Sequence, residues 1–210
     1  MNKEFCFKID KVQCDWAFKP IRSKVDVIEI LMRVIKTILV YKEPKDEDVS
    51  GMIKLHVAKM NRIFFFSEKK YYSISFPFTV ECGDLGFSFR NKDIDEIDSL
   101  LTSEVISLIN DKAFSDVSIY GFIDPLLTLI ESKERPYFWS FLKTLLTFED
   151  GYIRYDVDED RENGKLHPLY HFDIFYSNGP TFKVGLDKHC SNDTMVDILN
   201  IETDCFYFKG

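Results

Sequence analysis

Several patterns that mark common protein classes are missing from this sequence. The five cysteines are odd in number and form no CxxC pair, which argues against a disulfide framework and against a paired-cysteine metal site. No apolar segment follows a basic N-terminus, so no secretory signal peptide is expected. The longest apolar stretch, residues 25–41, is unsuited to crossing a bilayer because charged residues interrupt it, namely Asp26, Glu29, Arg33 and Lys36. We therefore expect a cytoplasmic protein with reduced thiols and no membrane partner.

Motifs for nucleotide binding and for two common kinds of hydrolysis are missing as well. The glycines form neither GxGxxG nor GxxxxGK, so no phosphate-binding loop is expected. Neither GxSxG nor HExxH occurs in the sequence. The net charge of −8 opposes a chain-wide basic surface for nucleic acid. A local patch stays open, because Lys69 and Lys70 precede Tyr71 and Tyr72, a cluster that either stacks on a base or forms the turn into a strand.

Aromatic residues, by contrast, are abundant, with 20 Phe and 10 Tyr against 2 Trp. Because aromatic side chains bury large areas, the 210-residue chain has the material for a substantial core. The sequence contains no internal repeat, low-complexity segment or flexible linker. It predicts a single α+β domain over residues 1–210, with a boundary near Arg135 as the alternative.

The first part of the chain contains both helical and strand-like patterns. Ser23 precedes an apolar stretch and has Asp26 three residues on, a capping box that predicts a helix over residues 25–41. Residues 52–89 contain segments that alternate apolar and polar positions, which is typical of a small antiparallel sheet. Further helices are expected to begin at Asn91 or Asp93, at Asp124 and at Pro136.

Residues 149–186 predict three strands joined by two turns. Gly164 and the run Asn178–Pro180 separate segments that alternate with the period of a half-buried strand. A helix from Ser191 to about Ile201 and a last strand over Cys205–Phe208 are expected to follow. The predicted fold class is therefore α+β, with an antiparallel sheet or sheets, helices packed on one face, and a C-terminal three-strand meander followed by a helix and a last strand. The pattern leaves open whether the strands form one sheet or two.

The run from His167 to Asp173 is the first candidate site. In a strand over residues 170–176, His171 and Asp173 point to the same face because side chains repeat every two residues. His167 stands just before Pro168, where the chain is extended. The two imidazoles and the carboxylate suit Zn²⁺, Mn²⁺ or Fe²⁺, or His171 serves as a general base oriented by Asp173. The alternative is that His167 caps a turn and the other two lie on a solvated sheet face.

A second candidate cluster occupies the preceding strand. Arg154, Asp156 and Asp158 share one strand face, and Lys183 on the third strand would extend it. Acids beside a basic residue occur in metal-dependent nucleases, although no ExK or QxK follows the acids here. An exposed, charge-protected edge strand has the same composition. The acidic run over residues 156–162 lacks the spacing of an EF-hand, which excludes that calcium site.

Cys190 is the one cysteine next to an expected helix start, because Ser191 is the predicted N-cap. A thiol near a helix N-terminus has a lowered pKa and can be reactive. The alternative is a buried, structural thiol.

The C-terminal third resembles a family of bacterial proteins known as a domain of unknown function. The matching runs are GYIRYDVD over residues 151–158, HPLYHFD over residues 167–173 and FKVGL over residues 182–186. The resemblance covers residues 150–208 and departs from the family at Lys183, where Arg is expected, and at Gly185, where Pro is often seen. It implies a bacterial or phage origin and a place in antiviral-defence gene neighbourhoods, and it supplies no reaction.

Two functional hypotheses result. The first is a cytoplasmic bacterial or phage protein that binds a protein partner, motivated by the aromatic content, the acidic charge and the incomplete catalytic motifs. The second is a metal-dependent hydrolase or nuclease that holds Zn²⁺ or Mn²⁺ through His167, His171, Asp173 and Asp156. In this second hypothesis, the catalytic residues are His171, Asp173 and Lys183, and the binding residues are Arg154 and Asp158.

Overall fold

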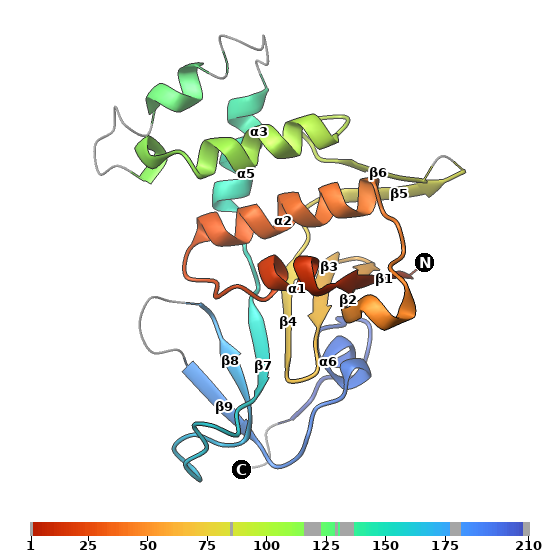
Figure 1. Cartoon of the computed structure of the whole chain (residues 1–210), viewed down its shortest axis with the longest axis vertical. Coiled ribbons are helices and arrows are strands. Elements are labelled where there is room, and N and C mark those ends of the chain that lie inside the picture. The colour runs from red at the N-terminus through yellow and green to blue at the C-terminus, as the bar shows by residue number, and fades with distance from the viewer. Residues whose placement is uncertain are drawn as a thin grey trace. The chain divides into compact units, whose positions relative to one another are not determined.

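The computed structural model shows a mixed α and β protein (Figure 1). It describes residues 2–84, 86–115, 123–128, 130, 137–176 and 182–207. The chain divides into two compact units, and it passes from one unit to the other four times. The first unit contains Met1–Arg22, Glu43–Phe76 and Asp150–Gly210, and the second contains Ser23–Lys42 and Pro77–Glu149. The single domain over residues 1–210 stays a prediction, and Arg135, the alternative boundary, lies outside the described residues.

The first unit is built on one seven-stranded antiparallel sheet with the order β1-β2-β3-β4-β7-β8-β9. Its strands are β1 (Lys3–Asp10), β2 (Val49–Val57), β3 (Arg62–Phe66), β4 (Lys70–Ser75), β7 (Ile153–Val157), β8 (Tyr170–Ile174) and β9 (Phe182–Leu186). A short 3-10 helix, η1 (Asp46–Asp48), precedes β2. The predicted meander therefore forms, and β4 pairs with β7 to join it to the earlier strands in one sheet.

One face of this sheet carries an apolar cluster, which we call the aromatic face. Its buried aromatic residues are Phe64, Phe66, Tyr71, Tyr155 and Phe172. Helix α6 (Asn192–Ile198) covers them with Met195 and Val196. The rings of Tyr71 and Tyr155 lie 5.1 Å apart, and those of Tyr155 and Phe172 lie 5.9 Å apart in an edge-to-face arrangement that aromatic pairs prefer.

Helix α1 (Lys11–Ala17) contacts the opposite face. The Tyr72 hydroxyl donates a hydrogen bond of 2.5 Å to the Ala17 carbonyl, whereas its neighbour Tyr71 points toward α6. A Cβ on Gly51 would lie 2.8 Å from the Cys14 Sγ, so only glycine lets α1 approach β2 this closely. The helices of this unit therefore cover both faces of the sheet, and the prediction of helices on one face is wrong in this detail.

The predicted α+β class, the antiparallel sheet and the C-terminal meander followed by a helix are confirmed. The predicted last strand over Cys205–Phe208 is wrong, because residues 205–207 form no strand, and Phe208 lies outside the described residues. The described sheet ends at β1 and β9, and neither pairs with this segment.

The second unit contains the helix that Ser23 and Asp26 predict. Helix α2 (Lys24–Leu39) starts at the Ser23 N-cap, whose backbone N–H donates to Asp26 at 2.9 Å. It packs against α3 (Ser99–Ile109) and α5 (Phe138–Thr147). A separate hairpin, β5 (Thr79–Gly83) and β6 (Gly86–Arg90), and the short 3-10 helix η2 (Lys112–Ser115) belong to the same unit. Residues 123–128 are helical, as Asp124 and Pro125 predict.

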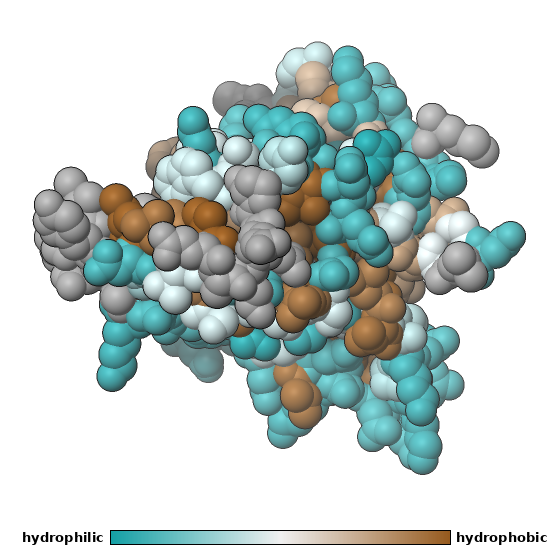
Figure 2. Space-filling view, turned by 90° about the horizontal axis from the view of Figure 1, so that it is seen from above, coloured by the Kyte–Doolittle hydropathy of each residue, from teal (hydrophilic) through white to brown (hydrophobic). Residues whose placement is uncertain are grey.

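Within the described residues, no helix combines the length and the apolar character that crossing a bilayer requires. On the face drawn in Figure 2, apolar residues occur in several groups with hydrophilic residues between them.

Candidate functional site

The sheet register brings both sequence clusters onto one side of β4, β7, β8 and β9. Arg154 lies opposite Asp173, which lies opposite Lys183. In the next row Lys70 lies opposite Asp156, which lies opposite His171. This set, which we call the charged face, consists of Lys70, Arg154, Asp156, His171, Asp173 and Lys183. The prediction that His171 and Asp173 share a face with the Arg154 strand and Lys183 is confirmed.

The carboxylates of the charged face are already paired with cations. Arg154 bonds to Asp173 and lies 2.6 Å from Asp156. The Lys183 Nζ donates to the Asp173 Oδ1 at 2.9 Å. The Asp173 side chain is fully buried, so these ion pairs replace the water that it has lost. The cluster is therefore a buried ion-pair network rather than a pair of open carboxylates.

Arg154 is the central cation of this network. Burial works against the charged form of its guanidinium. The neighbouring Tyr152, Asp156 and Asp173 outweigh burial and raise the pKa of Arg154 above its ordinary value. Arg154 is consequently a fixed positive charge that orients both carboxylates.

The hydrogen bonds of His171 define its tautomer. The Pro168 carbonyl can only accept, so the His171 Nδ1 donates the hydrogen bond of 2.8 Å that joins them. The Nε2 then accepts from the Lys183 ammonium at 2.9 Å. His171 is thus a neutral imidazole whose lone pair already binds Lys183.

The loop between β7 and β8 covers His171. The His167 ring packs edge-to-face on it with centroids 4.9 Å apart, and the His167 Nε2 donates to Asp158 at 2.9 Å. Pro168 covers Gly185, where a Cβ would lie 2.8 Å from the proline Cγ. His171 is fully buried beneath this loop. Only glycine at position 185 leaves room for this proline.

Asp158 anchors the same loop. Burial raises the pKa of its carboxyl, but hydrogen bonds from His167 and Arg161 outweigh burial and leave the pKa below its ordinary value. The Arg161 guanidinium lies 2.8 Å from the Asp158 Oδ2. These contacts fix the loop over the charged face.

His167 does close a turn, through backbone hydrogen bonds with Asn163, but the solvated sheet face and the exposed edge strand are both wrong. His171 and Asp173 do not lie on a solvated face, because both are fully buried. Strand β7 is not an exposed edge, because it pairs with β4 on one side and β8 on the other. His56 belongs to β2 and bonds Glu4 at 3.1 Å on the side of the aromatic face, so it does not approach the cluster. The catalytic, metal-binding and substrate-binding roles stay predictions.

Among the residues that the structure describes, two groups of side chains offer ligand atoms that lie within 4.8 Å of one another. One is Asp156, His171 and Asp173, and the other is Asp158, His167 and His171. In the first group Lys183 and Arg154 already donate to the atoms that a metal would need. In the second, both His171 nitrogens are engaged, by Pro168 and by Lys183. As arranged here, the donor set fits lysine and arginine better than a metal ion.

The sequence did not identify Lys70 as part of this site. In the basic cluster, Tyr71 and Tyr72 are buried and cannot stack on a base, so the turn into a strand was the correct alternative. Lys70 shares the face of Tyr72 by strand alternation, but only the pairing of β4 with β7 brings it beside Asp156. Residue spacing alone cannot predict that long-range pairing.

Cys190 is a structural thiol. It is buried in the apolar cluster beneath α6, and burial raises its pKa to about 11. Its backbone N–H donates to the Tyr155 hydroxyl at 3.3 Å. The alternative of a reactive thiol at the start of α6 is therefore wrong.

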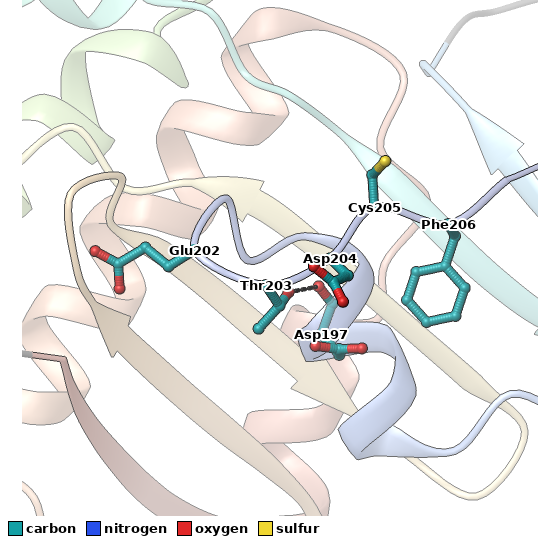
Figure 3. Close-up of a pocket in the computed structure, with 6 residues that line it drawn as sticks. All are labelled: Asp197, Glu202, Thr203, Asp204, Cys205 and Phe206. Carbon is teal, nitrogen blue, oxygen red and sulfur yellow. Dashed lines mark hydrogen bonds between the residues drawn. The ribbon is translucent and has the colours of Figure 1, made fainter.

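An open pocket of about 570 Å³ lies elsewhere in the first unit, near the C-terminus. Asp197, Glu202, Thr203, Asp204, Cys205 and Phe206 line it. Figure 3 shows that the Glu202 carboxylate points away from those of Asp197 and Asp204, while the Thr203 hydroxyl donates to the Asp197 carbonyl. The carboxylates do not converge on a point, so they offer no cation site.

The chain was compared with protein-family models, with curated proteins and with solved structures. None of the three comparisons finds a match. The resemblance of residues 150–208 to a bacterial family therefore stays a prediction, and the functional argument rests on the geometry of the chain itself.

Proposed function

We propose that this chain is a binding module that takes up an extended segment of a partner protein along the free edge of β9. The observation that carries the proposal is an exposed aromatic side chain, Phe182, on a strand that ends the sheet. Phe182, Val184 and Leu186 alternate onto one face of β9, where Val184 and Leu186 pack against the aromatic cluster and the Phe182 side chain is 66% exposed. β9 ends the strand order of the described sheet. An apolar edge with unpaired backbone groups is suited to adding one more strand.

The other edge of the same sheet supports this assignment by contrast. β1 carries Lys3, Glu4 and Lys8, charges of the kind that protect an edge from strand addition. β9 carries a single charged side chain, Lys183, so charge protects this edge less than it protects β1. The sheet is therefore protected at one edge and open at the other.

Phe175 adds a second exposed aromatic ring near this edge. It follows Ile174, the residue opposite Phe182, and its side chain is 69% exposed. Its φ of 68° is in the left-handed region, which is unfavourable for a bulky residue. Such backbone strain is often retained where a site needs it. Aromatic side chains are also the usual anchors of protein interfaces.

The proposed partner is a protein, and binding rather than turnover is the proposed activity. A cytoplasmic location and a place in a bacterial or phage antiviral-defence system extend this proposal through the resemblance of residues 150–208. Turnover of a nucleic acid or nucleotide by the purified chain alone would contradict it.

Phe182→Lys should abolish partner binding at the β9 edge, because a charge replaces the exposed apolar side chain and opposes strand addition. The measurement is photo-crosslinking in cells of the natural source, with a crosslinking amino acid at position 184 and mass spectrometry of the products. One protein should be crosslinked reproducibly, and Phe182→Lys should lower its yield at least tenfold.

The matched control is a crosslinking amino acid at Lys3 on the protected edge, which should capture none of that protein. Sedimentation velocity tests whether a second copy of this chain binds the β9 edge instead. Self-pairing would produce a dimer that Phe182→Lys converts to a monomer. Equal yields at positions 3 and 184, or a yield unaffected by Phe182→Lys, would rule out the β9 edge.

A metal-dependent hydrolase is the second candidate, because two groups of His and Asp side chains lie close together. In that case His167, His171, Asp173 and Asp156 would hold Zn²⁺ or Mn²⁺, and Lys183 would stabilise developing charge. The ion pairs of Lys183 and Arg154 weigh against it, because a metal would have to displace both cations.

We expect added Zn²⁺ or Mn²⁺ to leave the melting temperature of the wild-type chain unchanged, because a ligand stabilises a fold only by binding it. The measurement is a thermal melt of wild type and His171→Ala with and without each metal. A rise in melting temperature that His171→Ala loses would instead favour the hydrolase, and nucleic acids and nucleotides would then be tested as substrates.

A further inference from the structure

The charged face contains one more positive than negative charge. Its cations are Lys70, Arg154 and Lys183, and its carboxylates are Asp156 and Asp173. His171 does not alter this balance, because its hydrogen bonds define a neutral imidazole. The adjacent Asp158 is balanced by Arg161. Three cations against two carboxylates leave one positive charge without a counter-charge.

Lys70 is the unmatched cation. Arg154 bonds both carboxylates, and Lys183 bonds Asp173 and His171. Among the described residues, the Lys70 ammonium forms no ion pair and no hydrogen bond, although its side chain is half-buried at the start of β4. Burial and the neighbouring Arg154 lower the pKa of Lys70 and outweigh the opposite effect of Asp156 and Asp173, neither of which lies within ion-pair distance. A half-buried charge without a partner costs free energy that an incoming anion would recover.

Lys69 provides a comparison one residue away. Its ammonium is exposed and lies 2.6 Å from Glu159, so it already has a carboxylate. Of two adjacent lysines, the exposed one is paired and the half-buried one is not. This is the reverse of what stability alone favours, because a buried charge gains more from a partner.

We infer that Lys70, with Arg154 beside it, binds the oxyanion of a ligand, a carboxylate or phosphate group, on the charged face. Lys70 supplies a point charge with free N–H donors, and Arg154 supplies the positive field behind it. An oxyanion with one negative charge would neutralise the single surplus cation. The inference does not depend on the β9 edge, because it concerns the opposite side of the sheet.

The test measures acylation of individual lysines by an N-hydroxysuccinimide ester, read by mass spectrometry at constant ionic strength. Inorganic phosphate and acetate are the two probes, and they distinguish a phosphate from a carboxylate ligand. We expect one or both to slow the labelling of Lys70 at least fivefold and to leave Lys69 unaffected. Titration calorimetry with the same probe should show at least a tenfold loss of affinity in Lys70→Gln and wild-type affinity in Lys69→Gln.

Lys70→Arg keeps the charge and should retain binding, which separates loss of the cation from a change in packing. Lys70→Gln without ligand should be at least as stable as wild type, because it removes an unmatched charge. Labelling of Lys70 that neither probe slows, or unchanged affinity in Lys70→Gln, would overturn the inference. Protection by phosphate alone assigns a phosphate ligand, and protection by both probes assigns a carboxylate-sized site.

Discussion

Arg154→Met should lower the free energy of unfolding of the first unit by about 3–5 kcal/mol, the usual cost of removing one partner from a buried ion pair. Arg154 bonds Asp173 and lies 2.6 Å from Asp156. Without it, Asp173 would lose one of its two cations. Asp156 would keep no cation within ion-pair distance in the described part of the chain, because His171 is neutral. Methionine fills similar volume, so the loss is mainly electrostatic.

The measurement is urea unfolding followed by tryptophan fluorescence. The chain has 2 Trp, and Trp16 lies in the first unit whereas Trp139 lies in the second. Trp139→Phe therefore leaves one reporter in the unit that contains Arg154. Lys69→Met removes an exposed ion pair and should cost less than about 1 kcal/mol in the same background. A similar small effect of Arg154→Met would show that the network adds nothing to stability.

The first unit should also lose stability steeply as the pH rises from about 10 to about 12. Burial raises the pKa of Tyr152 and of Tyr155 to about 12, and it raises that of Tyr72 as well. An unfolded tyrosine has a pKa near 10. Between these values the unfolded chain releases protons that the folded chain keeps, so stability is full below pH 10 and falls above it. Tyr152 and Tyr155 should each contribute roughly 2–3 kcal/mol to this fall.

Tyr155→Phe tests this pH dependence. The variant keeps the ring against Tyr71 and Phe172 but has no proton to release, so its stability should fall less between pH 10 and pH 12. Tyr207→Phe is the matched control, because Tyr207 is 86% exposed and should leave the slope unchanged. Urea unfolding at several pH values gives both slopes. Identical slopes for Tyr155→Phe and wild type would contradict the prediction.

Local patterns were sufficient to predict much of this fold. Alternation over residues 153–186 predicted three strands, and the same period placed His171 and Asp173 on one face with Arg154 and Lys183. Ser23 and Asp26 predicted the start of α2, because a capping box acts within four residues. A second capping box, Asp10 with Gln13, starts α1 and could have revealed that helix. It was missed because the preceding strand pattern extends into it.

Features that depend on competing or distant contacts could not be predicted. Helix α3 begins after the Asp98 N-cap rather than at Asn91 or Asp93. The reason is local competition, since the Asn91 side chain accepts from the N–H groups of Asp93 and Ile94 and forms a turn instead. Neutralisation of the carboxylates by Lys183 and Arg154 depends on three paired strands, and the role of Lys70 depends on a fourth.

The interleaved path of the chain has a consequence for how the protein is made. β4 pairs with β7, so residues 70–73 can form these backbone hydrogen bonds only after residues 153–156, about eighty residues further along, have been synthesised. Until the ribosome has made that segment, Phe64, Phe66 and Tyr71 have no Tyr155, Phe172 or α6 to cover them. The final segment from Asp150 takes roughly 3–12 s to synthesise at ordinary rates. During that interval the half-built sheet exposes both an open strand edge and an aromatic surface, so the risk of aggregation is greatest late in synthesis, before β7, β8, β9 and α6 are complete.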